Sequence, residues 1–238
     1  MTAATLVYAV IAGAANLLGA VAVTSRARWS PRALQVIIAL SAGFLVAVAF
    51  AGLLPEAIER HGESAALVAL ASYVLVHLTQ HVLGRHFHFG EETHEVSPFA
   101  GMAALSGLML HTFVDGVAIA SSFQVSSELG LLVFLAIFLH KVPEGLAISS
   151  LFLASGASRR RALLAASVLA LATVVGAFVT TWVDGLAAYG LAISAGVSLY
   201  VGASNLVPEF QQEHDWRLPA AFVAGCLIYV AAHAAAGH

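Results

Sequence analysis

The sequence predicts an all-α integral membrane protein with eight transmembrane helices. Of its 238 residues, 60% are hydrophobic and only 10% are charged, and the mean hydropathy of +0.91 is far above that of soluble globular domains. Polar interruptions divide the chain into apolar runs of about 20 residues, the length that a helix needs to cross a bilayer core of roughly 30 Å. These runs are rich in Ala and Leu and lack the alternating pattern of a membrane β-barrel.

The apolar runs define the expected helices and leave no domain-sized linker, so residues 1–238 are expected to form one domain. The helices are expected at 3–23, 34–55, 64–84, 99–123, 129–153, 162–182, 187–208 and 218–236. The single cysteine, Cys226, excludes an intrachain disulfide and thiolate metal sites such as Cys₂His₂. The net charge of −3 is too small to indicate a nucleic-acid partner.

The ten Lys and Arg residues are distributed unevenly over the loops. The loops on one side of the membrane contain eight of them: Arg26, Arg28, Arg32, Arg85, Arg159, Arg160, Arg161 and Arg217. The other side has only Arg60, and Lys141 lies within a helix. Because basic loops stay in the cytoplasm, both termini are expected outside it. The expected localisation is the plasma membrane, which is the inner membrane in a bacterium.

Two of the expected helices are related in sequence. Residues 41–61 align without a gap to residues 194–214, and eight of the 21 positions are identical, including Ser-Ala-Gly at the start and Pro-Glu at one helix end. The second and seventh helices cross the membrane in opposite directions, so this match indicates an inverted repeat of helices 1–3 and 6–8 around helices 4 and 5. Inverted repeats are an architecture of transporters.

The repeat also places an acid near each mouth of the bundle. Glu56 is expected just outside the membrane and Glu209 just inside it, and His61 and His214 end the two repeats. Acids at opposite mouths suit a cation path, so these four residues are candidates for its gates. The alternative is that they are solvated residues at helix ends with no further role.

The pattern H-x-x-x-[DE]-G occurs twice, in the middle of the fourth and fifth expected helices. His111 and Asp115 belong to one copy, and His140 and Glu144 belong to the other, 29 residues later. A spacing of four puts each His and its acid on one helix face, where a charged group in mid-membrane costs about 2.5–3.5 kcal/mol on insertion scales. Two antiparallel helices packed through these faces would form a metal-binding shell. The alternative, a hydrogen-bonded network without a metal, is disfavoured because the whole motif is repeated.

Nitrogen and oxygen ligands without a thiolate suit Zn²⁺, and they also accommodate Fe²⁺, Mn²⁺, Co²⁺, Ni²⁺ or Cd²⁺. Pro143 cannot donate to the carbonyl of Leu139, so this carbonyl is a candidate to face the ion or water. Gly116 and Gly145 directly follow the two acids and allow close approach of a neighbouring backbone. No organic cofactor is expected.

In these residues the sequence resembles the ZIP family of divalent-metal transporters, whose fourth and fifth helices carry motifs like H-N-x-x-[DE]-G and H-[NEK]-x-P-[EH]-[EG]. The resemblance extends over essentially the whole chain, through "GFLVAVAFAGLLPEAIE", "HTFVDGVAIASSF", "HKVPEGLAIS" and "AGVSLYVGASNLVPE". It implies import of zinc or iron(II) toward the cytoplasm, with His111, Asp115, His140 and Glu144 as the transport ligands. It also implies an elevator-like or rocking movement of helices 1, 4, 5 and 6 against helices 2, 3, 7 and 8.

Two residues depart from the pattern of the family. Thr112 stands where many members have Asn, and Lys141 stands where members with two metals have an acid or an amide. A protonated ammonium cannot bind a metal and repels a cation, so one bound ion is expected instead of two. Lys141 is expected to pair with Glu144 or Asp115 as a tethered positive charge.

Residues 85–98 form a loop that carries "HFHFGEETHE", with His86, His88 and His94, and it is expected on the cytoplasmic side. This composition fits a weak, flexible metal site that accepts or senses the ion after translocation. The alternative is a solvated polar loop without a metal. No role is assigned to His233 and His238 near the end of the last helix.

Two other functions would use the same metal ligands. An intramembrane zinc hydrolase would hold an activated water on the metal, but the sequence has no H-E-x-x-H motif, and the repeat fits transport better. A passive metal-selective channel differs from a carrier only in rate and saturation. The leading interpretation is a divalent-metal transporter that is not an enzyme. Its expected partners are the ion, the lipid bilayer and, as one option, a second copy of the chain in a homodimer.

Overall fold

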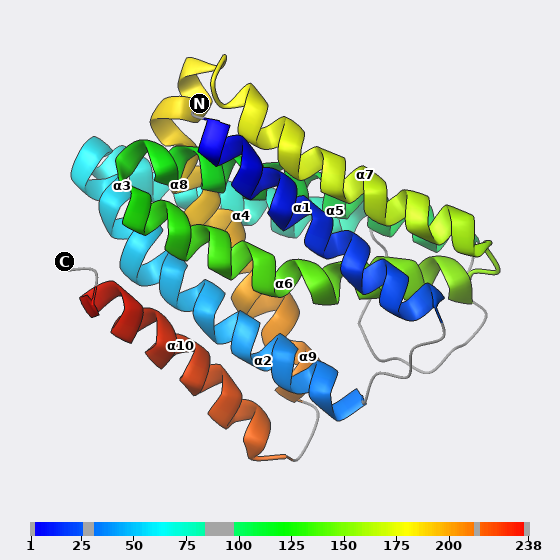
Figure 1. Cartoon of the computed structure of the whole chain (residues 1–238). Helices are drawn as coiled ribbons and strands as arrows, with labels where there is room; N and C mark the ends of the chain where they lie inside the picture. Colours follow the sequence, from blue (N-terminus) through cyan, green and yellow to red (C-terminus); the bar gives the residue numbers. More distant parts are fainter. Residues whose placement is uncertain (1–2, 26–30, 84–97, 212–214, 236–238) are drawn as a thin grey trace.

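The computed structural model of the protein describes residues 3–25, 31–83, 98–211 and 215–235. These residues form eight helical rods and no strand (Figure 1), so the expected all-helical fold is confirmed. Six rods are single helices: α1 (Ala3–Thr24), α4 (Glu63–Leu83), α5 (Pro98–Val125), α6 (Ser127–Ala154), α7 (Arg159–Val179) and α10 (Arg217–Ala235). Two rods are composite: α2 (Pro31–Val48) with η1 (Ala49–Leu53) and α3 (Leu54–His61), and α8 (Asp184–Leu199) with η2 (Tyr200–Leu206) and α9 (Val207–Gln211).

Seven of these rods are long and apolar enough to cross a membrane. The eighth, α4, has 21 residues, but its second half carries the polar residues His77, Thr79 and Gln80. The outer surface of the bundle exposes large apolar side chains, among them Leu67 on α4 and Leu171 on α7, which are 66% and 62% exposed. Such a surface suits lipid better than water.

Each composite rod contains a π-helical segment directly before a Pro-Glu pair. η1 leads into Pro55, and η2 leads into Pro208. A proline lacks the N–H that would continue the hydrogen-bond ladder, but it is tolerated in the first turn of a new α-helix, and the π segment supplies the change of register. The chain therefore stays helical as far as His61 and Gln211. The expected helix ends at residues 55 and 208 were too early for this reason.

Glycines allow several helices to pack with their backbones in contact. α1 lies against α6, and α7 lies against α5. A Cβ on Gly145 would overlap the carbonyl oxygen of Asn16 on α1, and a Cβ on Gly116 would overlap that of Thr173 on α7. Farther out, α2 packs on α10, and the two helices lie side by side in Figure 1. The helix α8 packs on α4, and both pairs meet through glycines. This packing leaves α5 and α6 as the two central helices.

Candidate metal centre

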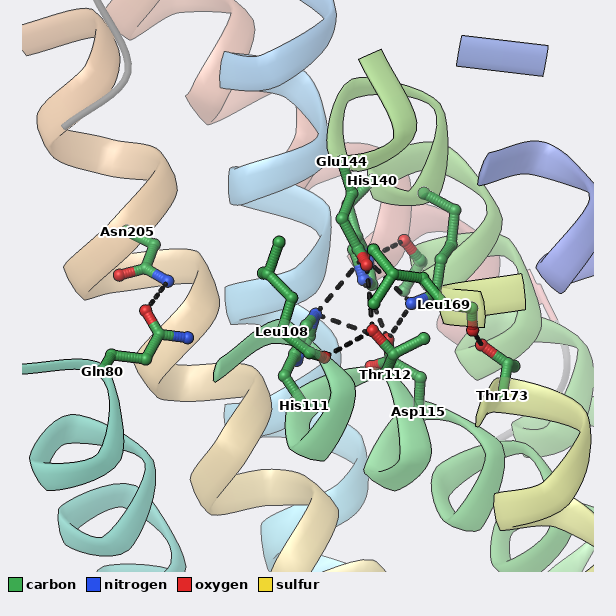
Figure 2. A network of polar contacts seen from close by, with 12 residues as sticks. Gln80, Leu108, His111, Thr112, Asp115, His140, Glu144, Leu169, Thr173 and Asn205 are labelled. Carbon is green, nitrogen blue, oxygen red and sulfur yellow. Dashed lines mark hydrogen bonds and ion pairs between the residues drawn. The ribbon is translucent and has the colours of Figure 1, made fainter. Parts of the chain in front are cut away.

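The polar faces of α5 and α6 meet inside the bundle (Figure 2). α5 contributes His111 and Asp115, and α6 contributes His140 and Glu144. One ligand atom from each of these four buried side chains lies within 4.8 Å of the corresponding atoms of the other three. The two copies of the motif therefore face each other.

The carboxylate of Asp115 lies between the two imidazole rings. Its Oδ2 is 3.4 Å from Nε2 of His111 and 3.4 Å from Nε2 of His140. The Nε2 of His111 is also 3.6 Å from Oε2 of Glu144. In a tetrahedral zinc site with ligand distances of about 2.0–2.1 Å, the ligand atoms are about 3.4 Å from one another. The three separations of 3.4–3.6 Å are close to those of ligands that share one small cation, and the full set, within 4.8 Å, would draw closer around the ion.

A backbone contact fixes the orientation and tautomer of His140. Its Nδ1 lies 2.9 Å from the carbonyl oxygen of Ala136, one turn earlier on α6. A carbonyl oxygen only accepts a hydrogen bond, so Nδ1 carries the hydrogen, and Nε2 of the neutral ring presents a lone pair to the cluster. This Nε2 is buried and has no hydrogen-bond partner among the described residues. Metal-binding histidines are commonly held in this way.

Lys141 bridges the two acids. Its Nζ is 2.6 Å from Oδ2 of Asp115 and 2.9 Å from Oε2 of Glu144, and its side chain is completely buried. Pairing with either acid was expected, and the structure has both contacts. With neutral imidazoles, two carboxylates and one ammonium leave a single negative charge at the cluster. Such a site attracts a divalent cation less strongly than two unpaired carboxylates would.

Thr112 lies next to the opposite oxygen of Glu144. Its Oγ1 is 2.9 Å from Oε1 of Glu144 and 2.6 Å from the carbonyl oxygen of Leu108, and its one hydrogen can be donated to either acceptor. Glu144 is therefore contacted by Lys141 through one oxygen and by Thr112 through the other. These two contacts orient the carboxylate toward His111.

The backbone around the site is regular and closely packed. α6 continues as an α-helix through the buried Pro143. The glycine after each acid, Gly116 or Gly145, rests against the backbone of α7 or α1. Each motif helix is therefore braced by one outer helix directly behind its acidic residue.

The candidate gate residues lie away from this cluster. Glu56 accepts a hydrogen bond of 2.6 Å from Nε of Arg60 on α3. His61 ends α3, and its ring stacks on Tyr189 with centroids 4.7 Å apart. Glu209 belongs to α9, but its side chain is not among those described. The remaining candidates lie outside the described residues: His214, His86, His88 and His94.

The sequence reasoning missed one buried polar residue beside the site. Asn16 on α1 is 0% exposed, its backbone packs on Gly145, and neither polar atom of its side chain has a hydrogen-bond partner among the described residues. Thr173 occupies the corresponding place behind Gly116. Asn16 could have been identified from the sequence, because it is a lone amide in the apolar run at 3–23.

A bundle of membrane-spanning helices with a buried cluster of two histidines and two acids at its centre defines a candidate metal-ion transporter. The family model of the ZIP zinc transporters matches residues 90–232, which are more than half of the chain and include both motif copies. The chain belongs to this family. ZIP transporters are not enzymes, so the alternative of a zinc hydrolase was wrong. A comparison with curated proteins found no match.

Proposed function

We propose that this protein is a zinc carrier that binds one Zn²⁺ ion between His111, Asp115, His140 and Glu144 and delivers it to the cytoplasm. The observation that carries the proposal is the mutual distance of the four ligand atoms, at most 4.8 Å, in a buried site on the two motif helices. This distance supports a shared ion better than it supports four independent hydrogen-bonding groups, because the Nε2 atom of His140 is otherwise unsatisfied.

The chemistry of the ligands supports zinc as the preferred cargo. Two neutral imidazoles and two carboxylates suit a borderline-soft ion, and they disfavour Mg²⁺ and Ca²⁺, which prefer oxygen ligands alone. The same set accommodates Fe²⁺, Mn²⁺, Co²⁺, Ni²⁺ and Cd²⁺. These five ions are therefore the expected competitors.

We infer that one ion is transported at a time, because the positive charge of Lys141 lies at the carboxylates that a second ion would need. Its ammonium already contacts both carboxylates, and a cation placed beside it would meet a like charge with little screening. The ion bound by the two histidines shares the carboxylates with this ammonium. The reduced negative charge supports release, which a carrier needs as much as binding.

Several packing relations support an inverted repeat and alternating access. α1 packs on α6 as α7 packs on α5, and α2 packs on α10 as α8 packs on α4. The π segments η1 and η2 lie at matching positions of the two aligned segments. We assign α1, α5, α6 and α7 to one moving group, and α2, α4, α8 and α10 to the other. The four ligands are at most 8% exposed, which supports a carrier over an open channel.

The path runs from Glu56 at the outer mouth to Glu209 at the inner mouth, with His61 and His214 beside them. This direction follows from the basic loops, which place both termini outside the cytoplasm of a plasma membrane or bacterial inner membrane. The loop at 85–98, with His86, His88 and His94, receives or senses the ion on the cytoplasmic side. The protein acts as a single domain, alone or as a homodimer.

Uptake by purified protein in liposomes tests the proposal. The expected result is saturable entry of Zn²⁺ into vesicles that contain a zinc-sensitive dye, with inhibition by competing Cd²⁺, Fe²⁺ or Mn²⁺ and none by Mg²⁺. Entry no faster than in protein-free vesicles, with protein inserted in both orientations, would refute transport. Entry that rises linearly with zinc and does not saturate would support a channel instead.

A further inference from the structure

A cavity of about 390 Å³ lies at the end of the bundle where α6 begins and α10 ends. Its polar wall contains Glu56 and Glu59 of α3, Glu128 in the first turn of α6, and His233 in the last turn of α10. We call this space the mouth cavity. It combines three carboxylates and one imidazole from three separate helices.

A buried hydroxyl lies next to two residues that line the mouth cavity, Gly52 and His233. Tyr229 is 0% exposed, and its Oη has no hydrogen-bond partner among the described residues. This Oη lies so close to Gly52, a lining residue, that a Cβ on Gly52 would overlap it. The ring of Tyr229 stacks on that of His233, with centroids 5.5 Å apart and planes 14° apart. A buried hydroxyl without a protein partner beside the cavity wall can be satisfied by a water or a polar ligand that enters the cavity.

The mouth cavity stops short of the buried cluster. Leu129 and Leu132 of α6 form part of its wall, and both are buried. Leu132 precedes His140 by eight residues, or about 12 Å along the helix. The intervening residues Val133, Ala136 and Ile137 are also buried and apolar. An ion in the mouth cavity is therefore separated from the cluster by two turns of closed, apolar helix.

We propose that the mouth cavity is a separate capture site for a divalent cation, held by Glu56, Glu59, Glu128 and His233 before it moves to the central cluster. The order of events, with capture before the central cluster, rests on the proposed direction of transport. Binding of a cation in the mouth cavity does not depend on that direction. Carboxylate oxygens and one imidazole form a harder, more exposed ligand set than the central one, so the cation keeps part of its water. Weak, fast exchange is what a capture site requires.

Arg60 regulates this site by competing for one ligand. Its Nε donates to Oε1 of Glu56 at 2.6 Å, and both side chains are partly exposed. An arriving cation displaces the guanidinium of Arg60 from Glu56. The guanidinium returns to Glu56 when the ion has moved to the central cluster. The Arg60→Gln variant should therefore bind and transport zinc at lower concentrations than the wild type.

Transport kinetics test the capture site. The variant Glu56→Gln/Glu59→Gln/Glu128→Gln should raise KM for Zn²⁺ about tenfold, a typical effect of a charged cleft on local ion concentration, and leave Vmax unchanged. His233→Gln should raise KM as well, although it removes no negative charge. The matched control is Glu63→Gln at the start of α4, an exposed acid outside the cavity, with KM unchanged. A triple variant with the KM of the wild type would overturn the proposal.

Binding provides a readout that does not depend on transport. In the Asp115→Asn/His140→Gln background, which lacks the central site, calorimetry with Zn²⁺ should show one weakly bound ion, and the three Glu→Gln changes should remove it. No bound ion in the background protein would overturn the capture site, whatever the uptake results. One weakly bound ion together with a wild type that does not transport would keep the capture site and reject the proposed function.

Discussion

The two copies of the motif, residues 111–116 on α5 and 140–145 on α6, share a histidine, an acid and a glycine but differ in the residue after the histidine. On α5 this residue is Thr112, which offers one neutral hydrogen bond to Glu144. On α6 it is Lys141, which contacts both Asp115 and Glu144 through its ammonium. The α6 copy therefore supplies a charge to the site, whereas the α5 copy supplies only a neutral donor.

In the proposed one-ion site, this difference accounts for the lack of a second ion. The ligands themselves are paired across the α5–α6 interface, and each acid is braced from behind through Gly116 or Gly145. By the resemblance to the family, a second ion would use ligands at positions 112 and 141. Here the Thr112 hydroxyl is shared between Glu144 and the carbonyl of Leu108, and the Lys141 ammonium repels a cation. The two copies therefore differ in the residue that follows each histidine, Thr112 or Lys141, and not in the kind of ligands that they supply.

The largest expected effect follows from removing one ligand from each copy. Asp115→Ala on α5 and His140→Ala on α6 should each nearly abolish zinc uptake into proteoliposomes, because each removes one of four groups that replace the water of the ion. Size-exclusion chromatography should show folded protein in both cases. Unchanged uptake in both variants would show that the two copies do not share an ion.

Exchange of the residue that distinguishes the copies should change the number of bound ions. Lys141→Asp or Lys141→Asn removes the ammonium and adds an oxygen ligand, so calorimetry should count one more zinc ion per chain than in wild type titrated beside it. Lys141→Met is the matched control, since it removes the charge without adding a ligand, and its count should stay at the wild-type value. An equal count in wild type and both oxygen-bearing variants would contradict the assigned role.

The bracing of the two acids should contribute to stability. Gly116→Ala and Gly145→Ala place a Cβ against the backbone of α7 and α1, and overpacking of this kind costs about 1–3 kcal/mol. Gly107→Ala is the control, because its Cβ would meet only the side chain of Gln80 at 3.9 Å. Thermal unfolding followed by tryptophan fluorescence should rank both variants below the control. Equal melting temperatures of the two variants and the Gly107→Ala control would mean that α7 and α1 make room for the added methyl groups without loss of stability.

The smallest expected effect concerns the hydrogen bond from Thr112. Thr112→Val keeps the shape of the side chain and removes one donor to Glu144, which corresponds to about 1 kcal/mol, or roughly a fivefold weaker zinc affinity. Ser122→Ala is a control on the same helix, because this hydroxyl donates to the backbone carbonyls of Ala118 and Ile119 on α5 and not to a ligand. If the two variants bind zinc equally well, Thr112 does not orient Glu144.

Local patterns in the sequence predicted most of the fold and the residues of the central cluster. Hydropathy gave eight helices, because lipid requires long apolar runs, and the i, i+4 spacing of His111 and Asp115 put them on one face. The helix ends after Pro55 and Pro208 were missed because a π segment restores the ladder. The mouth cavity was missed because Glu59, Glu128 and His233 meet only through tertiary packing. No role was assigned to His233 from the sequence.

Anomalous diffraction at the zinc absorption edge tests the central claim most directly. Crystals of the purified protein soaked in zinc should give one strong peak between α5 and α6, within about 2.0–2.2 Å of ligand atoms of His111, Asp115, His140 and Glu144. A peak that lies elsewhere in the membrane-spanning region, with these four side chains still facing one another and no zinc between them, would contradict it.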